Sequence, residues 1–345
     1  MKFKKLSKIL VGVVAATVLL SGCGTTKTAT SAKSDTFIYG IDGDPGNSVN
    51  VVTTSDRYGL MEIKALYSPL YMYNSKNIKF FLADSMTLSA DKLTYTAKLK
   101  KNVKWSDGVK FTADDVVFTY NEMLKDKNAG WAYGQLIFNN KPLKVEKVDD
   151  NTVKFILPEV SAPGIELLGN IFIMPKHIYA GETNFENSTK NAKPVGTGPY
   201  KLAEYKAGQY VKLVKNDNYF LGTPKIKNVI YRVIPDANTA KLALQRGEIN
   251  ALSVQSSDLK DLLKKDNLTA NKYDEGRIAY MVMNSNSQKL KDANVRKAIF
   301  YALKRTDLIN ASFGSTEYAK EAYSFLPNEG KYHTTEDRKS TRLNS

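Results

Sequence analysis

The sequence predicts a mixed α/β protein with two lobes, and three observations support that prediction. The chain has 345 residues, more than one typical domain contains. Hydrophobic residues make up 42 % of it and charged residues 25 %, which is the balance of an ordinary globular chain and excludes a disordered or collagenous one. Beyond residue 35, segments with period-two alternation and segments with helical periodicity follow one another.

The clearest strand is expected at residues 93–99, where apolar and polar residues alternate so that one face meets water. A hairpin is expected at residues 145–148 and 152–157, because Asp149-Asp150-Asn151 between them favours a turn. Three more strands are expected at residues 36–39, 210–214 and 229–234.

Helices are expected where capping residues precede an apolar stripe. Thr112 with Asp115 forms a capping box, and the helix that follows presents one apolar face: Val116, Val117, Tyr120, Met123 and Leu124. A second helix is expected from Ala237 to Arg246, ended by Gly247. A third is expected to begin after Asp292, to end on Lys304 and Arg305, and to bury four residues: Val295, Ile299, Ala302 and Leu303.

The first 22 residues are expected to be a secretory signal. Lysines in residues 2–8 precede an apolar run at 9–20, which is too short for a bilayer span of about 20 residues. Leu20-Ser21-Gly22-Cys23 resembles a bacterial lipobox, which implies cleavage before Cys23 and acylation of its thiol. The alternative is an ordinary signal peptide with an incidental cysteine. Residues 23–35 are expected to be a flexible tether.

The charge balance argues against a nucleic-acid partner. The formal net charge is +15, but without the leader's four lysines and the three bases of residues 338–345 it is +8. The remaining bases are interspersed with acids, so they are typical of a solvated surface. Residues 338–345 resemble a translated sequencing adapter, with a natural disordered tail as the alternative, and neither is expected to carry function.

The sequence contains few of the residues that usually bind metals, with one cysteine and two histidines. Cys23 is the single cysteine, which excludes an internal disulfide and a thiolate metal cluster. His177 and His333 are the only histidines, so neither a histidine metal site nor a cofactor is expected. Catalytic motifs such as G-x-S-x-G, H-E-x-x-H and the P-loop are absent from the sequence, so no catalytic residue is assigned.

Three stretches in order resemble the family 5 extracellular solute-binding proteins, which serve ABC importers of oligopeptides, dipeptides and nickel. The first is LKKNVKWSDGVKFTADDVVFTYN at residues 99–121, with its W-S-D-G turn and its helix. The second begins PVGTGPYKLAEY at residue 194 and continues to Asn250, and the third runs from Met283 to Ile309.

The resemblance implies a two-lobed periplasmic-binding-protein-like fold of type II with an inserted subdomain and an incomplete second lobe. The boundaries it implies are residues 36–65 and 185–270 for the first lobe, 66–184 for the inserted subdomain, and 271–337 for the start of the second lobe. Family members are considerably longer, so the chain is expected to be truncated. The acidic residue that pairs with a peptide's ammonium in peptide-binding members lies beyond its end.

The resemblance also implies a function. A monomer is expected on the outer face of the bacterial cytoplasmic membrane or in the periplasm, held to the membrane through acylated Cys23. It would capture a peptide or peptide-like solute noncovalently and deliver it to ABC permease subunits. The alternatives are a lipid-anchored surface hydrolase, and a peptide sensor or adhesin that uses the same fold.

Candidate ligand contacts lie in two glycine-containing loops. In the polar loop of residues 40–50, Asp42 and Asn47 are expected to face the ligand, with a surface turn or a Ca²⁺ loop as alternatives; the spacing does not match an EF-hand. Gly196, Thr197 and Gly198 fail as a phosphate loop because Lys201 stands where G-x-G-x-x-G needs glycine. A tight turn near the interlobe face is expected there instead, whose backbone N–H groups could face the cleft.

Three further side chains are candidates. Tyr67 suits either core packing or ligand contact, because its ring is apolar and its hydroxyl polar. Trp131 lies in an aromatic loop after the capped helix and is expected to face the ligand. Asn284 follows a strand expected to end at Met283 and could reach the ligand's main chain. Trp105, within the W-S-D-G turn, is expected to be structural, and His177 to be a surface or capping histidine.

Overall fold

The computed structural model describes residues 35–74, 77–125, 132–273 and 278–322. The predictions for the signal, Cys23, the tether up to residue 34, Trp131 and residues 338–345 therefore concern positions outside the described residues.

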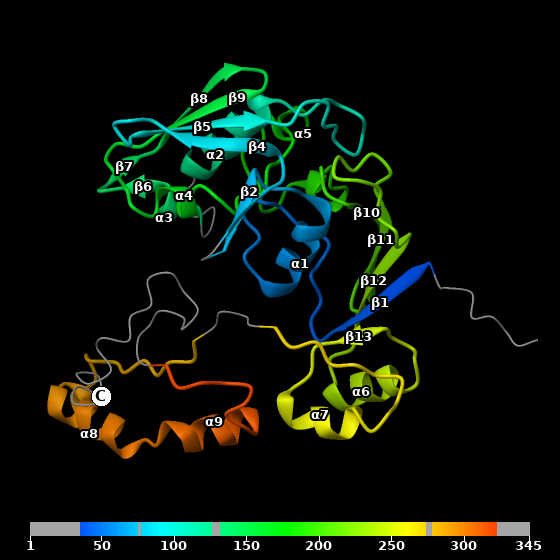
Figure 1. Ribbon diagram of the computed structural model, residues 1–345, viewed down its shortest axis with the longest axis vertical. Coiled ribbons are helices and arrows are strands. Elements are labelled where there is room, and N and C mark those ends of the chain that lie inside the picture. The colour runs from blue at the N-terminus through cyan, green and yellow to red at the C-terminus, as the bar shows by residue number, and fades with distance from the viewer. Residues whose placement is uncertain (1–34, 75–76, 126–131, 274–277, 323–345) are drawn as a thin grey trace, which may run out of the picture. The chain divides into compact units, whose positions relative to one another are not determined.

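A five-stranded sheet joins the beginning of the described chain to its middle (Figure 1). Its order is β10 (Tyr200–Lys206), β11 (Tyr210–Lys215), β12 (Asn228–Val233), β1 (Thr36–Ile41) and β13 (Ala251–Leu252). β1 runs parallel to both β12 and β13, while β10 and β11 form an antiparallel hairpin. The strands expected at 36–39, 210–214 and 229–234 are thus confirmed, with the last displaced by one residue.

Two helices pack on this sheet. α1 (Arg57–Leu66) contacts β10, and α6 (Ala237–Gln245) contacts β13. α6 begins at Asp236, whose side chain accepts a hydrogen bond from the Thr239 N–H, and it is followed by Gly247 at φ +73°, a value that glycine adopts without strain. A small apolar cluster packs beside α6: Ile234, Ala240, Ala243 and Ile249, with Ile38 of β1 against them.

A separate four-stranded antiparallel sheet lies within residues 83–156 (Figure 1). Its order is β4 (Ala83–Leu88), β5 (Thr94–Leu99), β9 (Thr152–Ile156) and β8 (Lys144–Asp149). The predicted strand at 93–99 and the predicted hairpin are confirmed. α2 (Ala113–Lys125) packs on β8 and β9 with Val116, Tyr120 and Met123 buried, so the expected apolar face is confirmed for those three residues.

The beginning of α2 is fixed by a buried carboxylate. Asp115 is 4 % exposed and accepts hydrogen bonds from the backbone N–H groups of Thr112 and Lys176, both at 2.9 Å, and from the Trp105 indole at 3.3 Å. The Thr112 hydroxyl in turn accepts from the Asp114 N–H at 3.3 Å. The capping box is therefore confirmed, and Trp105, fully buried, is structural as expected.

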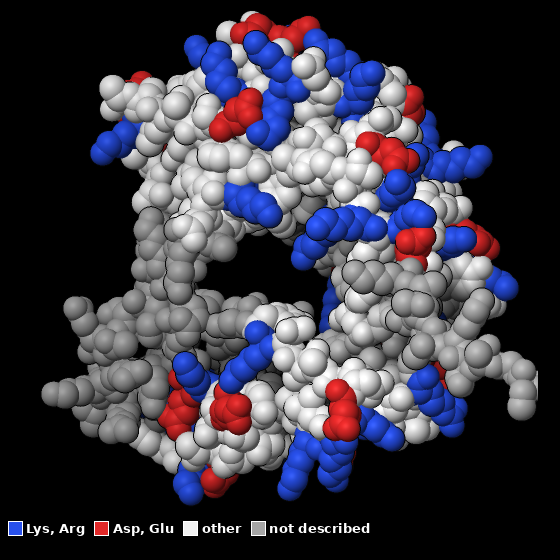
Figure 2. All heavy atoms as spheres, turned by 45° about the vertical axis from the view of Figure 1, so that its right-hand side comes forward, with Lys and Arg blue, Asp and Glu red and all other residues white. Residues whose placement is uncertain are grey.

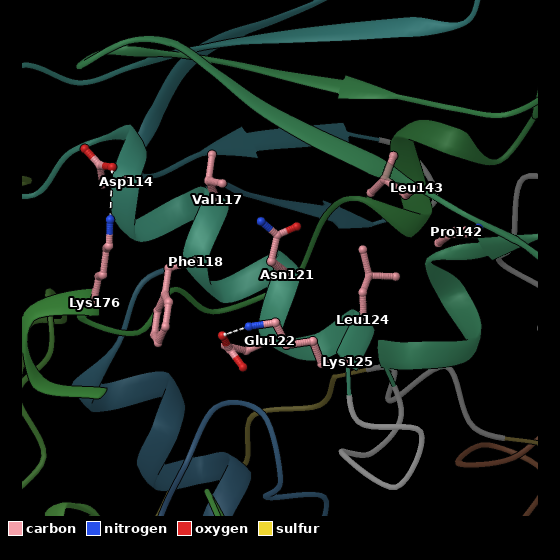
Figure 3. A pocket seen from close by; sticks show the side chains of 10 residues that line it. All are labelled: Asp114, Val117, Phe118, Asn121, Glu122, Leu124, Lys125, Pro142, Leu143 and Lys176. Atoms are coloured by element: carbon pink, nitrogen blue, oxygen red, sulfur yellow. Dashed lines mark hydrogen bonds and ion pairs between the residues drawn. The ribbon is translucent and has the colours of Figure 1, made fainter. Parts of the chain in front are cut away.

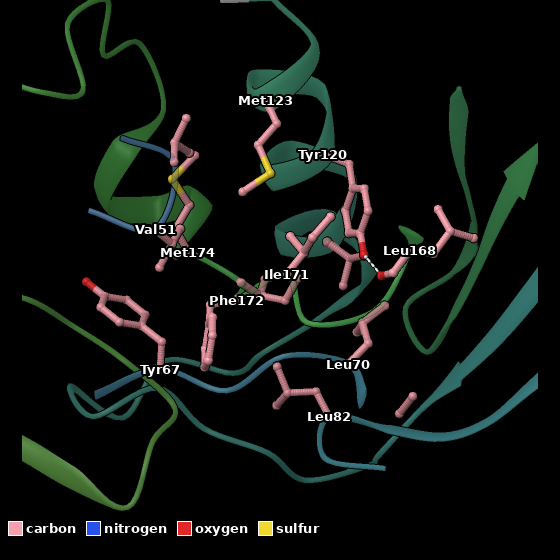
Figure 4. Packing of buried hydrophobic residues seen from close by; sticks show 14 of the residues in the cluster. Val51, Tyr67, Leu70, Leu82, Tyr120, Met123, Leu168, Ile171, Phe172 and Met174 are labelled. Atoms are coloured by element: carbon pink, nitrogen blue, oxygen red, sulfur yellow. Dashed lines mark hydrogen bonds between the residues drawn. The ribbon is translucent and has the colours of Figure 1, made fainter. Parts of the chain in front are cut away.

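The main core connects this sheet to α1 and to the chain that leads into it (Figure 4). Aromatic and aliphatic side chains meet there, and the buried hydroxyl of Tyr120 donates to the Leu168 carbonyl at 2.7 Å. Residues drawn in that figure include Val51, Leu70, Leu82, Ile171, Phe172 and Met174. Tyr67 and Tyr71 are also buried in this core, so Tyr67 packs in the core, which is one of the two roles expected for it.

Short elements complete the fold up to the last strand of the five-stranded sheet. They are β2 (Tyr71–Asn74), β3 (Asn77–Phe80), α3 (Ala132–Gln135), β6 (Ile137–Phe138), β7 (Lys141–Pro142), α4 (Gly164–Leu167), α5 (Lys176–Tyr179) and the 3₁₀ turn η1 (Thr189–Ala192).

The C-terminal described part is helical: α7 (Ser256–Leu262), η2 (Gln288–Leu290), α8 (Ala293–Ala302) and α9 (Arg305–Phe313). α8 begins after Asp292 as predicted, because the Asp292 side chain caps the Asn294 N–H at 2.7 Å. The predicted C-terminus is wrong: the helix ends at Ala302, and Lys304 caps α9 instead.

The burial expected for α8 is also wrong. Val295 is 41 % exposed, Ala302 is exposed, and Ile299 and Leu303 are only partly covered. The strand expected to end at Met283 is likewise not formed. An amphipathic face is buried only when another layer covers it, and among residues 271–322, where placement is described, there is no strand and no buried residue.

Asp115→Ala is expected to lower the free energy of unfolding by about 3 kcal/mol, because one buried donor and two partly buried donors lose their acceptor. Asp114→Ala is the matched control. Its carboxylate is 42 % exposed and pairs with Lys147 and Lys176, so its loss costs at most about 1 kcal/mol. Urea denaturation followed by circular dichroism measures both, and equal losses would contradict this assignment.

Candidate functional site

The Gly196-Thr197-Gly198 turn lies against the C-terminal end of α1. A Cβ on Gly196 would overlap the carbonyl oxygen of Leu66, and one on Gly198 would lie 2.7 Å from the same oxygen. The Gly198 N–H donates to that oxygen at 2.8 Å. Because only glycine has no Cβ, the sequence Gly-x-Gly is required here by close backbone approach.

Three further residues, Ser106, Ser68 and Asn216, hold the turn in place. The Ser106 N–H donates to the Gly196 carbonyl at 2.9 Å, and the Ser106 hydroxyl accepts from the Gly196 N–H at 3.3 Å. The Ser68 hydroxyl donates to the Thr197 carbonyl, and the Asn216 amide donates to the Gly198 carbonyl at 2.9 Å. The chain bends at residues 197–199, and the N–H groups of Gly196 and Gly198 are hydrogen-bonded within the protein.

Tyr67 lies directly beside this turn. It is 2 % exposed, and burial raises the pKa of its hydroxyl well above the usual range. Beyond it the Tyr179 hydroxyl donates to the Asn191 side-chain oxygen at 3.0 Å, which also accepts from the Asn50 amide at 3.1 Å. This buried network fixes Asn50, at the end of the loop of residues 40–50 that contains Asp42 and Asn47.

Asp42 and Asn47 are both exposed in that loop, which follows β1. The Tyr58 hydroxyl, at the start of α1, donates to Asp42 at 2.7 Å, and this bond holds the pKa of the Asp42 carboxyl below its usual range. Asp42 therefore carries its negative charge in neutral solution at the carboxyl end of a parallel strand, where ligands of open α/β sheets bind.

Asp44, which the sequence analysis did not single out, anchors the loop to the β10–β11 hairpin. Its carboxylate accepts from the Tyr205 hydroxyl at 2.9 Å, from the Gly208 N–H at 2.6 Å and from the Gly46 N–H at 2.9 Å. Its position two residues after Asp42, before Pro45, is the only sign in the sequence that could have found it.

Glu62 is a second residue that the sequence analysis missed. It lies on α1, is 2 % exposed, and its Oε2 has no hydrogen-bond partner. Burial, aided by the charges of Asp44 and Asp56, raises the pKa of Glu62 to about 8. A glutamate within the buried face of α1, next to Ile63 and near Gly59, is the sequence signal that could have indicated it.

The predicted contacts do not gather into one cluster. Tyr67 and the Gly196–Gly198 turn lie together, whereas Asp42 contacts Tyr58. Asn284 is exposed and makes a local turn, accepting the Asn286 N–H on its side chain at 3.0 Å. His177 pairs with Asp107 at 2.8 Å and packs on Trp105, so it belongs to the W-S-D-G turn.

An open groove of about 470 Å³ runs along α2, and none of the predicted contacts lines it (Figure 3). Two ion pairs lie among its lining residues, Asp114 with Lys176 and Glu122 with Lys125. The remaining lining residues are Val117, Phe118, Asn121, Leu124, Pro142 and Leu143.

Surface charge and metal ligands add no further site in the described part. On the face drawn in Figure 2, Lys and Arg lie among Asp and Glu. Within the described ranges, no group of three or more His, Cys, Asp or Glu residues is placed to hold a metal ion, so the loop of residues 40–50 forms no Ca²⁺ cluster of that kind. None of the helices described has the length and hydropathy needed to cross a bilayer.

The structure combines a mixed five-stranded sheet with a separate four-stranded antiparallel sheet, and the Gly196–Gly198 segment contacts both α1 and the W-S-D-G turn. The chain belongs to the bacterial extracellular solute-binding proteins, family 5, whose family model (Middle) matches residues 77–342. The resemblance stated from the sequence is thereby confirmed.

Known proteins support the same fold. The ABC transporter substrate-binding protein CtaP from Listeria monocytogenes has 44 % identity and a TM-score of 0.81, over 88 % of this chain and 62 % of CtaP. The oligopeptide-binding protein AppA from Bacillus subtilis, solved in complex with a nonapeptide, has 33 % identity and a TM-score of 0.71, over 85 % of this chain and 58 % of AppA. The type II periplasmic-binding-protein fold class is therefore confirmed.

The chain spans only part of its relatives' length. It is 34 % identical to the curated AppA sequence from Bacillus subtilis over 328 residues, which cover 90 % of this chain and 59 % of AppA. The expected lobe boundaries and the expected truncation stay predictions.

Gly196→Ala is expected to lower the free energy of unfolding by more than about 3 kcal/mol, because the added methyl group meets a backbone carbonyl that cannot move alone. Gly134→Ala is the control, since a Cβ there meets nothing within 4 Å and the residue lies in α3. Thermal unfolding of both variants checks the expectation, and a Gly196→Ala protein as stable as Gly134→Ala would contradict it.

Glu62→Gln is expected to remove a pH dependence of stability. The pKa of Glu62 is raised in the folded state, so its stabilising contribution is complete below the unfolded pKa of about 4.5 and is lost as pH rises through about 8. Between those pH values, Glu62 lowers the free energy of unfolding of the wild type by up to about 1.4 kcal/mol for each unit by which the pH rises.

The measurement is chemical denaturation at intervals from pH 5 to pH 9. The Glu62→Gln profile should be flatter than the wild-type profile. Glu204→Gln is the matched control, because Glu204 is exposed on β10 and should leave the wild-type slope intact. Parallel profiles for wild type and Glu62→Gln would show that the carboxyl is not a buried, protonated group.

Proposed function

We propose that this chain is the substrate-binding component of an ABC importer, which captures peptides or similar small solutes outside the cell and delivers them to the permease. The observation that carries the proposal is the family match across residues 77–342. The complex of AppA with a nonapeptide supports the ligand class.

Binding is noncovalent in this proposal. Asp42, at the carboxyl end of β1, offers a charged acceptor, and Asn47 in the same exposed loop offers an amide. Hydrogen bonds to the ligand's main chain supply affinity, and water fills the spaces around its variable side chains. The Gly196–Gly198 turn and Tyr67 act behind this surface by fixing the loop, not by touching the ligand.

The proposal includes a lipid anchor. Acylation of Cys23 would hold the receptor at the outer face of the cytoplasmic membrane, and residues 24–35 would give it reach toward the permease. Two acyl chains or more are needed for lasting attachment, because a single chain binds only marginally.

No enzymatic step is proposed. A serine nucleophile needs a histidine base within hydrogen-bond reach, and the one histidine in the described part, His177, is engaged with Asp107. The hydrolase alternative therefore lacks a supporting observation. The sensor or adhesin alternative differs from transport only in the partner that receives the loaded receptor.

Titration calorimetry of the 345-residue chain with peptides of two to nine residues tests the proposal. Binding should be detected, and Asp42→Ala should weaken it by about tenfold through loss of a charged acceptor, equivalent to 1.4 kcal/mol. Asp217→Ala, an exposed change at a residue paired with Lys215, should not weaken it. Absence of heat with every peptide, or equal affinity in both variants, would contradict the proposal.

A further inference from the structure

Glu62 is a buried carboxyl group, and one of its oxygens has no hydrogen-bond partner. The residue is 2 % exposed, and its Oε2 is one of two buried side-chain atoms left unpaired in the described part of the chain. It lies on α1, the helix that contacts β10. Burying an unpaired polar atom costs free energy, and the cost is much greater when the group is charged. Glu62 therefore fits its site only in the neutral form.

The titratable groups of the described chain that interact with Glu62 are carboxylates and tyrosines. Asp44, in the loop of residues 40–50, and Asp56, at the start of α1, both oppose its ionisation. Burial first, and these two carboxylates second, raise the pKa of Glu62 to about 8. Glu62 is therefore neutral in slightly acidic solution and charged in alkaline solution. The tyrosines that interact with it are Tyr67, Tyr205 on β10 and Tyr231 on β12.

Asp44 also attaches the loop of residues 40–50 to the β10–β11 hairpin. Its carboxylate accepts from the Tyr205 hydroxyl at 2.9 Å and from the Gly208 N–H at 2.6 Å. Asp44 and Tyr205 both interact electrostatically with Glu62. A negative charge on Glu62 therefore repels the side chain that attaches the loop.

We propose that Glu62 is a positioning residue for the loop of residues 40–50: when Glu62 loses its proton, the Asp44 attachment opens and the loop separates from the β10–β11 hairpin. Water then reaches the new charge and solvates it. When the proton returns, the loop is attached again.

The loop moves, rather than the helix or the sheet, because its attachment lies at the surface. Asp44 is exposed, whereas Ile63, beside Glu62 on α1, is buried, and so are Val211 and Leu213 of β11. Opening the loop breaks hydrogen bonds that water can replace. Moving α1 or the sheet would instead expose apolar core, which costs more.

The consequence for the ligand rests on the proposed function. Asp42 and Asn47, the proposed ligand contacts, lie in the same loop and move with it. The apparent affinity of a receptor falls in proportion to the fraction of molecules that is competent to bind. One pH unit above the pKa of Glu62, about one tenth of the molecules keep the proton, so affinity falls by up to about tenfold.

Fluorescence anisotropy of a dye on the loop tests the mechanism without any ligand. Cys23 is the single cysteine, so the 345-residue chain with Cys23→Ser and Asn47→Cys takes a maleimide dye only at position 47. That position is exposed, so the dye displaces no buried side chain. As pH rises from about 6 to about 9.5, the anisotropy should fall with a midpoint near pH 8.

Three substitutions in this labelled chain identify the responsible group. Glu62→Gln should hold the high anisotropy at every pH, because an amide does not ionise. Asp56→Asn should shift the midpoint to lower pH, since a charge that opposes ionisation of Glu62 is lost while asparagine still caps α1. Glu204→Gln, an exposed change on β10, should leave the midpoint unchanged. Circular dichroism at neutral pH checks that each variant is folded.

Calorimetry with peptides and the unlabelled chain measures the consequence for the ligand. The ratio of the wild-type to the Glu62→Gln dissociation constant should rise by up to about tenfold from about pH 7 to about pH 9. Taking the ratio cancels the titration of the peptide's own amino group, whose pKa is about 8.

The inference is overturned if the anisotropy of the chain with Glu62 stays constant with pH, if Glu62→Gln keeps the transition, or if Asp56→Asn leaves the midpoint in place. It is also overturned if a peptide binds and the ratio of dissociation constants stays constant. Failure of every peptide to bind would contradict the proposed function alone, because the anisotropy measurement needs no ligand.

Discussion

The contact on which much of this architecture depends is the approach of two glycines to the last carbonyl group of α1. Gly196 and Gly198 lie so close to the carbonyl oxygen of Leu66 that a Cβ atom on either glycine would overlap it. That contact joins the segment after the four-stranded sheet to α1, which precedes the sheet in the chain, and Ser106 adds the W-S-D-G turn through two hydrogen bonds to Gly196. This close backbone contact therefore connects parts of the chain that are more than 120 residues apart in sequence.

Buried polar groups near this contact are hydrogen-bonded to one another and fix how the surrounding segments pack. Asn191 holds Tyr179 and Asn50 at one side-chain oxygen, while Asp115 satisfies three donors at the start of α2. Burying such a polar group costs free energy unless it is hydrogen-bonded. Packing arrangements that break these hydrogen bonds are therefore less stable than the one observed. Two buried side-chain atoms in the described part have no hydrogen-bond partner, the Thr197 hydroxyl and Glu62 Oε2. Burial raises the pKa of Glu62, which favours its neutral form.

Local patterns in the sequence predicted the elements well because their causes are local. The capping box at Thr112, the hairpin around Asp149 and the glycine after α6 each depend on neighbours a few residues away. The face of α8 was predicted wrongly because burial depends on a covering layer, which periodicity cannot supply. Asp44 was missed for the same reason, since its partners Tyr205 and Gly208 are more than 160 residues distant.

The position of β1 has a consequence for how the chain reaches this state. Thr36 stands beside Asn228, 192 residues later, and the Ile38 N–H bonds to Asn250, 212 residues later. During synthesis β1 therefore leaves the ribosome long before β12 and Asn250 are added to the chain. Pairings so distant in sequence are slow to form because a large loop must close first. The four-stranded sheet of residues 83–156 contains the β4–β5 and β8–β9 hairpins, whose contacts are local, so it can form before β1 finds its neighbours in the five-stranded sheet.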